Sequence, residues 1–264
     1  MIYAILGASN QNYLQSKNEL KHCHKDVEAW LALIMDKYKL ENSKIVLVRD
    51  VNHYEFKTKL DVFLSSIPPN EHGVLIYSGH GSRIMYMDDD VIIKEEAIRF
   101  LDKNFTESEL AYAIDQFLHK DAKLTVILDS CYSGMIDLFK RYDELDDLEH
   151  YVKSIKAFQE DENVDSPKGF KKIEHVRLGS SSLHPHLVIL AATEGELAYE
   201  YDDNERQNGV FTYHAVGLLN EKPSMSLVEM DDYLTSLKPF SPYHNQRPCM
   251  KYPETIKSNP LFIF

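Results

Sequence analysis

Short apolar runs that alternate with helical patterns constrain the fold of this chain more than any other feature. The runs lack the polar alternation of a half-exposed strand, which is typical of strands buried on both faces of a sheet. We expect strands at Ile2–Ala8, Lys44–Val48, in the runs that precede His80 and Cys131, and at Pro185–Ala192. Helical periods fall at Gln15–Tyr38, Tyr54–Leu64, Thr106 to about His119, Gly209–Leu219 and Ser226–Leu237. This alternation predicts an α/β fold with helices on both faces of a mostly parallel sheet.

Local sequence patterns predict one helix start and the conformation of the chain end, but give no prediction for the segment between Gly134 and Leu183. Thr106, followed three residues later by Glu109, predicts a capping box at the start of a helix. The end of the chain, Gln246–Phe264, is expected to be an extended segment. Between Gly134 and Leu183 the pattern breaks down, and a polar stretch of this length inside a compact domain usually has a function or is disordered.

Composition limits the classes of function. The 264 residues are 44% hydrophobic, which is ample for the core of a single α/β unit. A net charge of −13 repels nucleic acid, so we expect no nucleic-acid partner. The first apolar stretch is too short for a signal peptide, and no run reaches a membrane-spanning length. Three cysteines make a disulfide framework unlikely, so we expect a reduced, cytoplasmic protein with no membrane partner.

Two strand ends carry chemistry. Cys131 follows the run Leu-Thr-Val-Ile-Leu-Asp-Ser, and His80 follows Gly-Val-Leu-Ile-Tyr-Ser-Gly, 51 residues earlier. If the two strands are neighbours, their carboxyl ends lie at one edge of the sheet, where open α/β sheets place their sites. A thiol and an imidazole from distant parts of the chain would then meet, as cysteine-nucleophile catalysis requires. The alternative is an inert cysteine that is merely small and buried.

Four segments, in this order along the chain, resemble the caspase–metacaspase clan of cysteine proteases. Tyr77–Gly81 is similar to its histidine motif, and Asp129–Gly134 to the metacaspase form of its cysteine motif. Leu20–Val27 is similar to Leu-x-Gly-Cys-x-Asn-Asp-Ala, with His22 in place of Gly and Lys25 in place of Asn. The fourth match is similar to the small-subunit part of bacterial caspase-like proteins and comprises Ala191–Glu194, Glu200 and Gly209–Thr212. A spacing of about 50 residues from histidine to cysteine is already known for caspases, so it checks the resemblance and does not extend it.

The resemblance implies a caspase-like three-layer sandwich in one peptidase domain, residues 1–264. A large-subunit-like part (1–134) and a small-subunit-like part (184–264) would be joined by a linker loop, 135–183. It further implies that His80 and Cys131 form a catalytic dyad, and that the backbone N–H groups of Gly81 and Cys131 receive the oxyanion. We expect Gly79 and Gly81 to let the backbone turn sharply beside the imidazole.

By the same resemblance, Asp26 and Asp129 line the pocket for the residue before the scissile bond. Two carboxylates at the bottom of a pocket select a cation, which points to Arg or Lys at the cleaved position. The alternatives are structural. Asp129 could cap the next turn, and Asp26 could be an acid in the first turn of a helix, where the macrodipole favours it.

Metacaspases often need calcium, and four acidic residues roughly match the positions that bind it: Glu95, Glu96, Glu107 and Asp137. Ser108 stands where a carboxylate is usual, and losing a carboxylate weakens a calcium site without excluding one. We therefore predict no required cofactor, with calcium as an option. The histidines of His22-Cys23-His24 and His184-Pro185-His186 lack zinc-site spacing.

The function that follows is a regulated effector protease, a cysteine endopeptidase that cleaves proteins or peptides after Arg or Lys. Its activating signal would be another protein, a metal or proteolysis. We expect cleavage of the linker, favouring residues 168–177, and the alternative is an enzyme that works as an intact single chain. Two alternatives stay open: a catalytically silent caspase fold that acts as a regulatory or binding partner, and an aspartate-specific caspase-like protease.

Overall fold

The structure is a computed structural model that describes residues 1–11, 20–88, 91–131, 186–192, 197–201, 205–236 and 246–262. At residues 85–88, 91–94 and 186 it describes the backbone alone. The predicted linker, 135–183, therefore lies outside the described residues, as does the calcium candidate Asp137.

A six-stranded sheet forms the middle layer, in the order β2-β1-β3-β7-β8-β9. The first five of these strands run parallel, and β9 is antiparallel to β8. Their bounds are β1 Ile2–Ser9, β2 Ile45–Arg49, β3 His72–Gly79, β7 Lys123–Asp129, β8 His186–Leu190 and β9 Cys249–Lys251. All eight residues of β3 are buried, as expected for a central parallel strand. The predicted mostly parallel sheet is confirmed.

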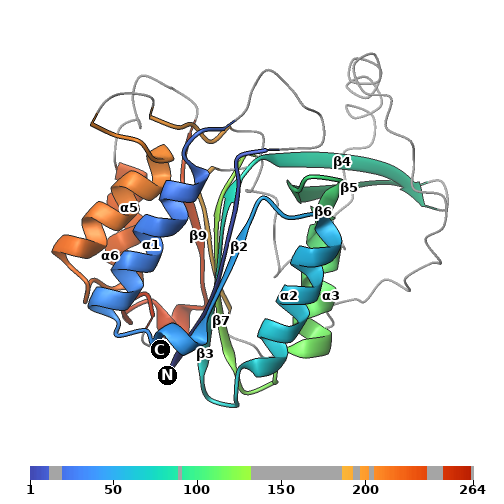
Figure 1. Cartoon of the computed structure of the whole chain (residues 1–264). Helices are drawn as coiled ribbons and strands as arrows, with labels where there is room; N and C mark the ends of the chain where they lie inside the picture. The colour runs from blue at the N-terminus through green and yellow to red at the C-terminus, as the bar shows by residue number, and fades with distance from the viewer. Residues whose placement is uncertain are drawn as a thin grey trace.

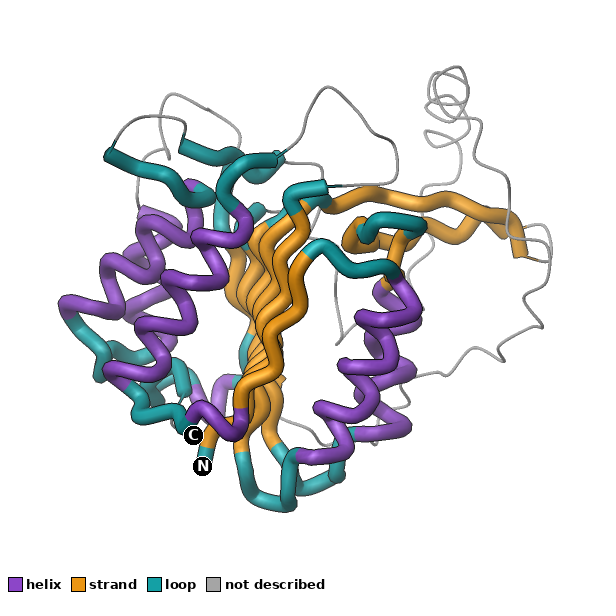
Figure 2. Tube along the Cα trace, in the orientation of Figure 1, coloured by secondary structure: helices purple, strands orange, loops and turns teal. Residues whose placement is uncertain are grey.

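Helices cover both faces of this sheet, so that Figure 2 shows three layers with the sheet between. On one face lie α1 Cys23–Lys37, α5 Val210–Glu221 and α6 Leu227–Ser236, and on the other α2 His53–Ser66 and α3 Glu107–Phe117 (Figure 1). Two short 3₁₀ turns, Asn42–Lys44 and Glu254–Ile256, complete the described helices. Each face buries its own apolar cluster, one around Trp30 and Phe211 and the other around Phe56 and Tyr77. The predicted three-layer sandwich is confirmed.

A second, smaller sheet was not predicted. It consists of β4 Gly81–Asp88, β5 Val91–Arg99 and β6 Asn104–Thr106, all antiparallel, and it lies beyond the ends of α2 and α3 (Figure 1). Only His80 separates β4 from β3. A strand that follows another strand with no intervening helix or turn cluster falls outside the strand–helix alternation on which the sequence prediction depended.

Helix α1 begins later than predicted. The helical period suggested a start at Gln15, whereas the helix begins at Cys23 and Leu20–His22 are not helical. The carboxylate of Glu200 accepts the backbone N–H groups of Lys21 (3.0 Å) and His22 (2.9 Å). The side chain of Asn10 accepts the N–H of Cys23 (3.0 Å). These distant acceptors satisfy the donors at the helix start, which sequence periodicity cannot reveal.

Other local predictions are close to the observed bounds. The capping box is confirmed, since Thr106 Oγ1 accepts the N–H of Glu109 while Glu109 Oε2 accepts the N–H of Thr106. The final segment is partly extended, with β9 at its start. In the part of the chain that the structure describes, no helix has the length and apolar character needed to cross a membrane.

Candidate active site

The fold brings His80 and Cys131 to one edge of the sheet. Strands β3 and β7 are paired neighbours, and Ser78 lies opposite Asp129 in the last pair of their ladder. His80 and Cys131 each stand two residues beyond that pair. A Cβ on Gly81 would lie 2.9 Å from the carbonyl carbon of Cys131 and 3.2 Å from its backbone nitrogen. The backbones that carry the two candidate catalytic residues are therefore in contact.

The two glycines around His80 act differently from our expectation. We expected them to turn the chain sharply, but neither has a φ in the left-handed range. Each instead leaves room for a close neighbour: the Cys131 backbone at Gly81, and the ring and hydroxyl of Tyr77 at Gly79. At both positions a side chain would approach its neighbour more closely than real contacts allow. Close approach is the second use of glycine in proteins, besides positive φ.

The Cys131 thiol is partly buried and donates a hydrogen bond to the carbonyl of Ala198 (3.6 Å). Burial raises the pKa of this thiol, and the nearby Asp129 carboxylate raises it further, against the opposing effect of the Ala198 contact. The thiol is thus held in its neutral form at rest. To act as a nucleophile it must pass its proton to a base.

Asp26 and Asp129 meet at the amino-terminal end of α5. Asp26 Oδ1 accepts the N–H of Gly209 (2.8 Å) and the side-chain amide of Asn208 (3.0 Å). Asp129 Oδ2 accepts both the hydroxyl (2.7 Å) and the N–H (3.2 Å) of Thr212. A helix start offers unpaired N–H groups and a positive dipole end, which favour carboxylates. The two acids therefore join the strand and helix of the first half of the chain to a helix of the second half.

Both carboxyls are almost removed from solvent, with relative exposures of 1% for Asp26 and 6% for Asp129. Burial raises the pKa of Asp129 to about 6, although both bonds from Thr212 oppose the shift. Burial, followed by the neighbouring Asp129 charge, raises the pKa of Asp26 well above its ordinary value. Two buried carboxyls this close resist being ionised together, and a cation placed between them would relieve that repulsion.

Several residues around the acids had no role assigned from the sequence. Ser78 Oγ donates to Asp26 Oδ2 (2.7 Å), and Trp30 Nε1 donates to the hydroxyl of Thr212 (3.2 Å). Glu200 accepts a long contact from Cys23 Sγ (3.7 Å) and is one cause of the raised pKa values of Cys23 and Asp129. From the sequence, Gly209–Thr212 and Glu200 were named only as part of the family resemblance and were given no role. No local pattern indicates which helix start will donate hydrogen bonds to a distant carboxylate.

Among the described residues, the calcium candidates do not lie around one point. Glu95 Oε1 accepts the N–H of Ser108 (2.8 Å), whereas Glu96 Oε1 accepts Arg83 Nε (2.9 Å). Consecutive residues of a strand point to opposite faces, so Glu95 and Glu96 cannot share one ion. Glu107 is the first residue of α3. Within the described ranges, no three His, Cys, Asp or Glu side chains are placed to hold a metal, and the residues present do not fit a calcium site.

The histidines around Cys23 and Pro185 were not expected to bind zinc, and the structure describes the first of these segments in full. His24 Nε2 lies 2.8 Å from Asp50 Oδ2, so this histidine is paired with a carboxylate. Cys23 is buried in the first turn of α1. His184 and Pro185 are outside the described residues, and of His186 only the backbone is described.

Comparison with known proteins identifies the family. Residues 5–257 match the model of the caspase domain family, so the chain belongs to that family, a class of cysteine-type peptidases. Among curated relatives, Metacaspase-1 of Schizosaccharomyces pombe and Metacaspase-6 of Arabidopsis thaliana are each 29% identical over 47% of this chain. The matches cover 32% and 36% of those two proteins, so the chain spans about a third of their length.

Solved structures support the fold. A crystal structure of a Geobacter sulfurreducens protein matches 100% of this chain and 99% of its own, with a TM-score of 0.63 and 17% identity. Caspase-1 from Spodoptera frugiperda matches 95% of this chain and 88% of its own, with a TM-score of 0.57 and 10% identity. At these identities the likeness concerns the fold alone.

Proposed function

We propose that this protein is a cysteine endopeptidase that uses Cys131 as nucleophile and His80 as acid and base. The observation that carries the proposal is the contact between the backbones of Gly81 and Cys131, at the ends of two paired strands. That contact sets the imidazole-bearing residue beside the thiol-bearing one. The family of the chain supports the same chemistry.

The reaction proceeds in two steps. Cys131 Sγ passes its proton to the His80 imidazole and attacks the carbonyl carbon of the scissile peptide bond. The backbone N–H groups of Gly81 and Cys131 receive the oxyanion, and His80 then protonates the leaving amine as the C–N bond breaks. Water, deprotonated by His80, next attacks the thioester carbon, which releases the carboxylic acid and returns the proton to Cys131.

Asp26 and Asp129 are proposed to select Arg or Lys at the cleaved position. Their burial, their mutual repulsion and their raised pKa values describe a place where a cation is favoured. The hydrogen bonds that both acids receive from the start of α5 also stabilise the fold. Asp26 lies in the first turn of α1, as its structural alternative expected, whereas Asp129 accepts from the distant Thr212. An aspartate-specific enzyme would need cations here, and the two buried acids disfavour it.

The test is a panel of fluorogenic peptides with Arg, Lys, Asp or Leu before the scissile bond, assayed with and without calcium. Cys131→Ala should abolish turnover, and His80→Ala should lower it by about 10²–10⁴-fold. Cys249→Ala is the matched control, because Cys249 is a half-buried cysteine on β9, and it should retain full activity. Turnover that persists in Cys131→Ala would exclude the mechanism.

The panel also separates the two alternatives. A catalytically silent regulatory or binding protein would turn over none of the peptides, and its Cys131 would resist an Arg-directed electrophile. Preference for Asp over Arg would overturn the proposed specificity and leave the dyad intact. Calcium that raises activity would indicate a site outside the described residues, since those described do not form one.

We further propose one peptidase domain over residues 1–264, regulated by cleavage of the linker 135–183. The linker contains a Lys-rich stretch at 168–172, which an acidic pocket would accept. The cut is made either by the enzyme itself or by an activating protease. Incubating wild type beside Cys131→Ala and mapping fragments by mass spectrometry separates these cases, because self-cleavage requires the thiol and cleavage by another protease does not.

A further inference from the structure

We propose that Tyr77 is a positioning residue for His80, and that its hydroxyl acts through the backbone of Arg99. The inference rests on the proposed peptidase function, in which His80 moves the proton. Tyr77 lies on β3, three residues before His80, with its ring inside the core. It does not touch the reacting atoms in this proposal, and its role is to hold the segment that does.

Both backbone polar groups of Arg99 are used in this arrangement. The N–H of Arg99 donates to the carbonyl of His80 (2.9 Å), and the carbonyl of Arg99 accepts the hydroxyl of Tyr77 (2.7 Å). Arg99 is the last residue of β5, which belongs to the smaller sheet, whereas Tyr77 belongs to the large one. Two hydrogen bonds therefore join Arg99 of the smaller sheet to Tyr77 and to His80. Together with the chain from Tyr77 to His80, they close a ring that connects the two sheets.

His80 depends on this connection because it is the one residue between the two sheets. The chain leaves β3 at Gly79 and enters β4 at Gly81, and Gly81 is paired with Ile98, next to Arg99. A rotation of the smaller sheet against the large one would move the backbone of His80 relative to Cys131. The Tyr77 hydroxyl resists that rotation directly, because it joins the two sheets beside the histidine.

Packing around Tyr77 accounts for an aromatic ring at this position but does not require a hydroxyl group on it. The ring is fully buried and lies edge-on to Phe100, which is itself stacked on Phe56, so phenylalanine would satisfy the packing. A buried hydroxyl costs free energy unless it is hydrogen-bonded. Burial raises the pKa of this hydroxyl well above its ordinary value, which keeps it a donor across the working pH range. The hydroxyl donates its hydrogen bond to the carbonyl of Arg99.

Gly79 fits the same interpretation. A Cβ at Gly79 would overlap the hydroxyl and the ring of Tyr77 (2.9 Å from Cε1), so the missing side chain is what lets the hydroxyl pass toward Arg99. The glycine before His80 thus makes room for Tyr77, and the glycine after it makes room for Cys131. The Gly-His-Gly sequence becomes a consequence of two close approaches on either side of the histidine.

The experiment compares Tyr77→Phe with Tyr38→Phe. Tyr38 is a matched control because its hydroxyl also donates to a backbone carbonyl, that of Pro223 (2.9 Å), and it lies on the opposite face of the sheet. Each variant loses one phenol–carbonyl hydrogen bond, and both should show a fall in Tm, larger for the fully buried Tyr77 than for the partly buried Tyr38. Tyr77→Phe should in addition lower kcat by about 10–100-fold with KM unchanged. A shift of about 1 Å in the position of His80 relative to Cys131 has effects of this order.

A second readout does not depend on peptide turnover. The rate at which iodoacetamide alkylates Cys131 should change its pH profile in Tyr77→Phe, since His80 no longer lies correctly beside the thiol, and should be unchanged in Tyr38→Phe. Replacing Tyr77 with para-aminophenylalanine keeps a donor at the same place and should recover most of the lost kcat. If Tyr77→Phe fails to fold, the para-aminophenylalanine variant alone is compared with wild type, and its weaker donor should lower kcat measurably.

The outcomes separate the inference from the proposed function. Wild type without activity on any peptide overturns the proposed function. An active wild type with Tyr77→Phe inside twofold of its kcat, and with the same alkylation profile, overturns the positioning role alone. A folded para-aminophenylalanine variant that is as slow as Tyr77→Phe also overturns the positioning role. If Tyr77→Phe cannot be made, a para-aminophenylalanine variant with the kcat of wild type overturns it.

Discussion

Gly209 lies directly against the carboxylate of Asp129, in a space too small for a side chain. A Cβ at this position would overlap Asp129 Oδ2 and lie 3.0 Å from both Asp129 Cγ and Asp26 Oδ2. The glycine at the start of α5 therefore lets both acids approach the helix. It links the architecture of the second half of the chain to the proposed specificity pocket in the first half.

Gly209→Ala is expected to displace one or both carboxylates. We expect a loss of about 1–3 kcal/mol in the free energy of unfolding, the usual cost of overpacking, together with a raised KM for Arg substrates. Gly217→Ala on the same helix is the control, because a Cβ there meets nothing within 4 Å. It should stabilise the helix by up to about 1 kcal/mol and leave KM unchanged. Equal behaviour of the two variants in thermal unfolding and kinetics would contradict the close fit.

Activity on Arg substrates should depend on pH through Asp129. Burial raises the pKa of this carboxyl to about 6, so it binds a proton and loses its charge as the pH falls below that value. A cationic side chain is attracted to the ionised form, and kcat/KM should therefore fall as the pH is lowered through about 6. Asp129→Asn should have a lower kcat/KM that lacks this dependence. The control is Asp231→Asn on α6, which removes another carboxyl with a raised pKa and should keep the wild-type profile.

Stability at acid pH should depend on His72, which is buried at the start of β3. Burial lowers the pKa of its imidazole from 6.5 to about 4, and the nearby charges of Lys123 and the amino terminus add to the shift. In the unfolded chain the imidazole binds a proton at about pH 6.5. Its contribution to stability is therefore complete above pH 6.5 and is lost as the pH falls toward 4, by about 3 kcal/mol at most.

His72→Gln cannot titrate and could keep the hydrogen bond to Thr125 Oγ1, which is 2.8 Å from His72 Nε2. Its free energy of unfolding, measured by urea denaturation, should fall less than that of wild type between pH 6.5 and 4. The comparison with wild type is needed because Asp129 titrates in the same range with the opposite sign. His119→Gln changes an exposed histidine and should leave the wild-type slope unaltered.

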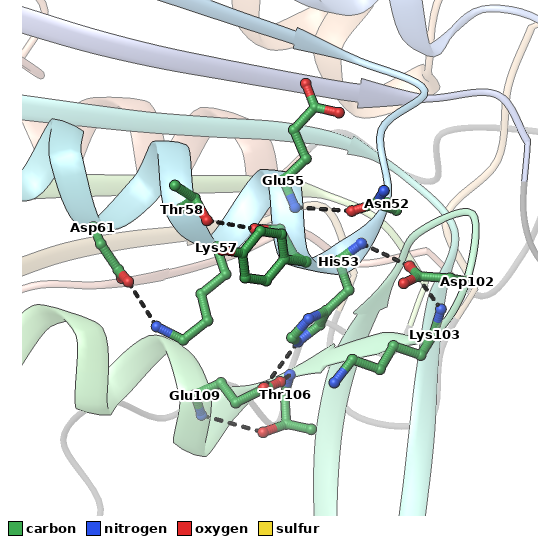
Figure 3. Close-up of polar contacts among 11 residues, drawn as sticks. Asn52, His53, Glu55, Lys57, Thr58, Asp61, Asp102, Lys103, Thr106 and Glu109 are labelled. Carbon is green, nitrogen blue, oxygen red and sulfur yellow. Dashed lines mark hydrogen bonds and ion pairs between the residues drawn. The ribbon is translucent and has the colours of Figure 1, made fainter.

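Two capping boxes among the described residues, Thr106 with Glu109 and Ser226 with Glu229, should differ in strength. Glu109 accepts the N–H of Thr106 and also pairs with the buried His53 (Nε2 to Oε1, 2.8 Å), which stands at the start of α2 (Figure 3). Asp102 holds the N–H of His53 (2.6 Å) from the neighbouring turn. Removing Glu109 thus loses a cap and leaves the ring nitrogen of a buried histidine without this partner.

We expect Glu109→Ala to lower the free energy of unfolding by about 2–3 kcal/mol, the sum of a cap and a stranded buried polar group. Glu229→Ala is the matched change in α6, where Glu229 accepts the N–H and hydroxyl of Ser226 in an exposed position. Its effect should be clearly smaller. A double variant of His53 and Glu109 that loses only the sum of its two single effects would show that the pair is not coupled.

Periodicity and strand-end chemistry were enough to predict the large sheet and the two residues at its edge. Four or more consecutive apolar residues can be buried only inside a layered fold, and the residue that follows such a strand must lie at the sheet edge. Tyr77 to His80 and Leu128 to Cys131 obey that logic. The capping box at Thr106 was equally accessible, because both its members lie within one helical turn.

Contacts between distant segments could not be read in the same way. The start of α1 depends on Glu200, 178 residues after His22. Asp26 and Asp129 accept hydrogen bonds from residues that follow them by 83 positions or more. The smaller sheet, β4–β6, has no helix to separate it from β3. In each case the partner that satisfies a backbone or carboxylate group is supplied by chain folding, and nothing in the local pattern specifies it.

The residues beside His80 and Cys131 show this difference most clearly. Gly79, His80 and Gly81 could be recognised as a motif, yet the reason for the glycines lies in the Tyr77 ring and the Cys131 backbone. Local sequence governs which residues alternate, cap and end a strand, because those effects act within a few residues. Which groups then touch, and how closely, depends on packing between layers, since buried polar atoms must find partners wherever the folded chain places them.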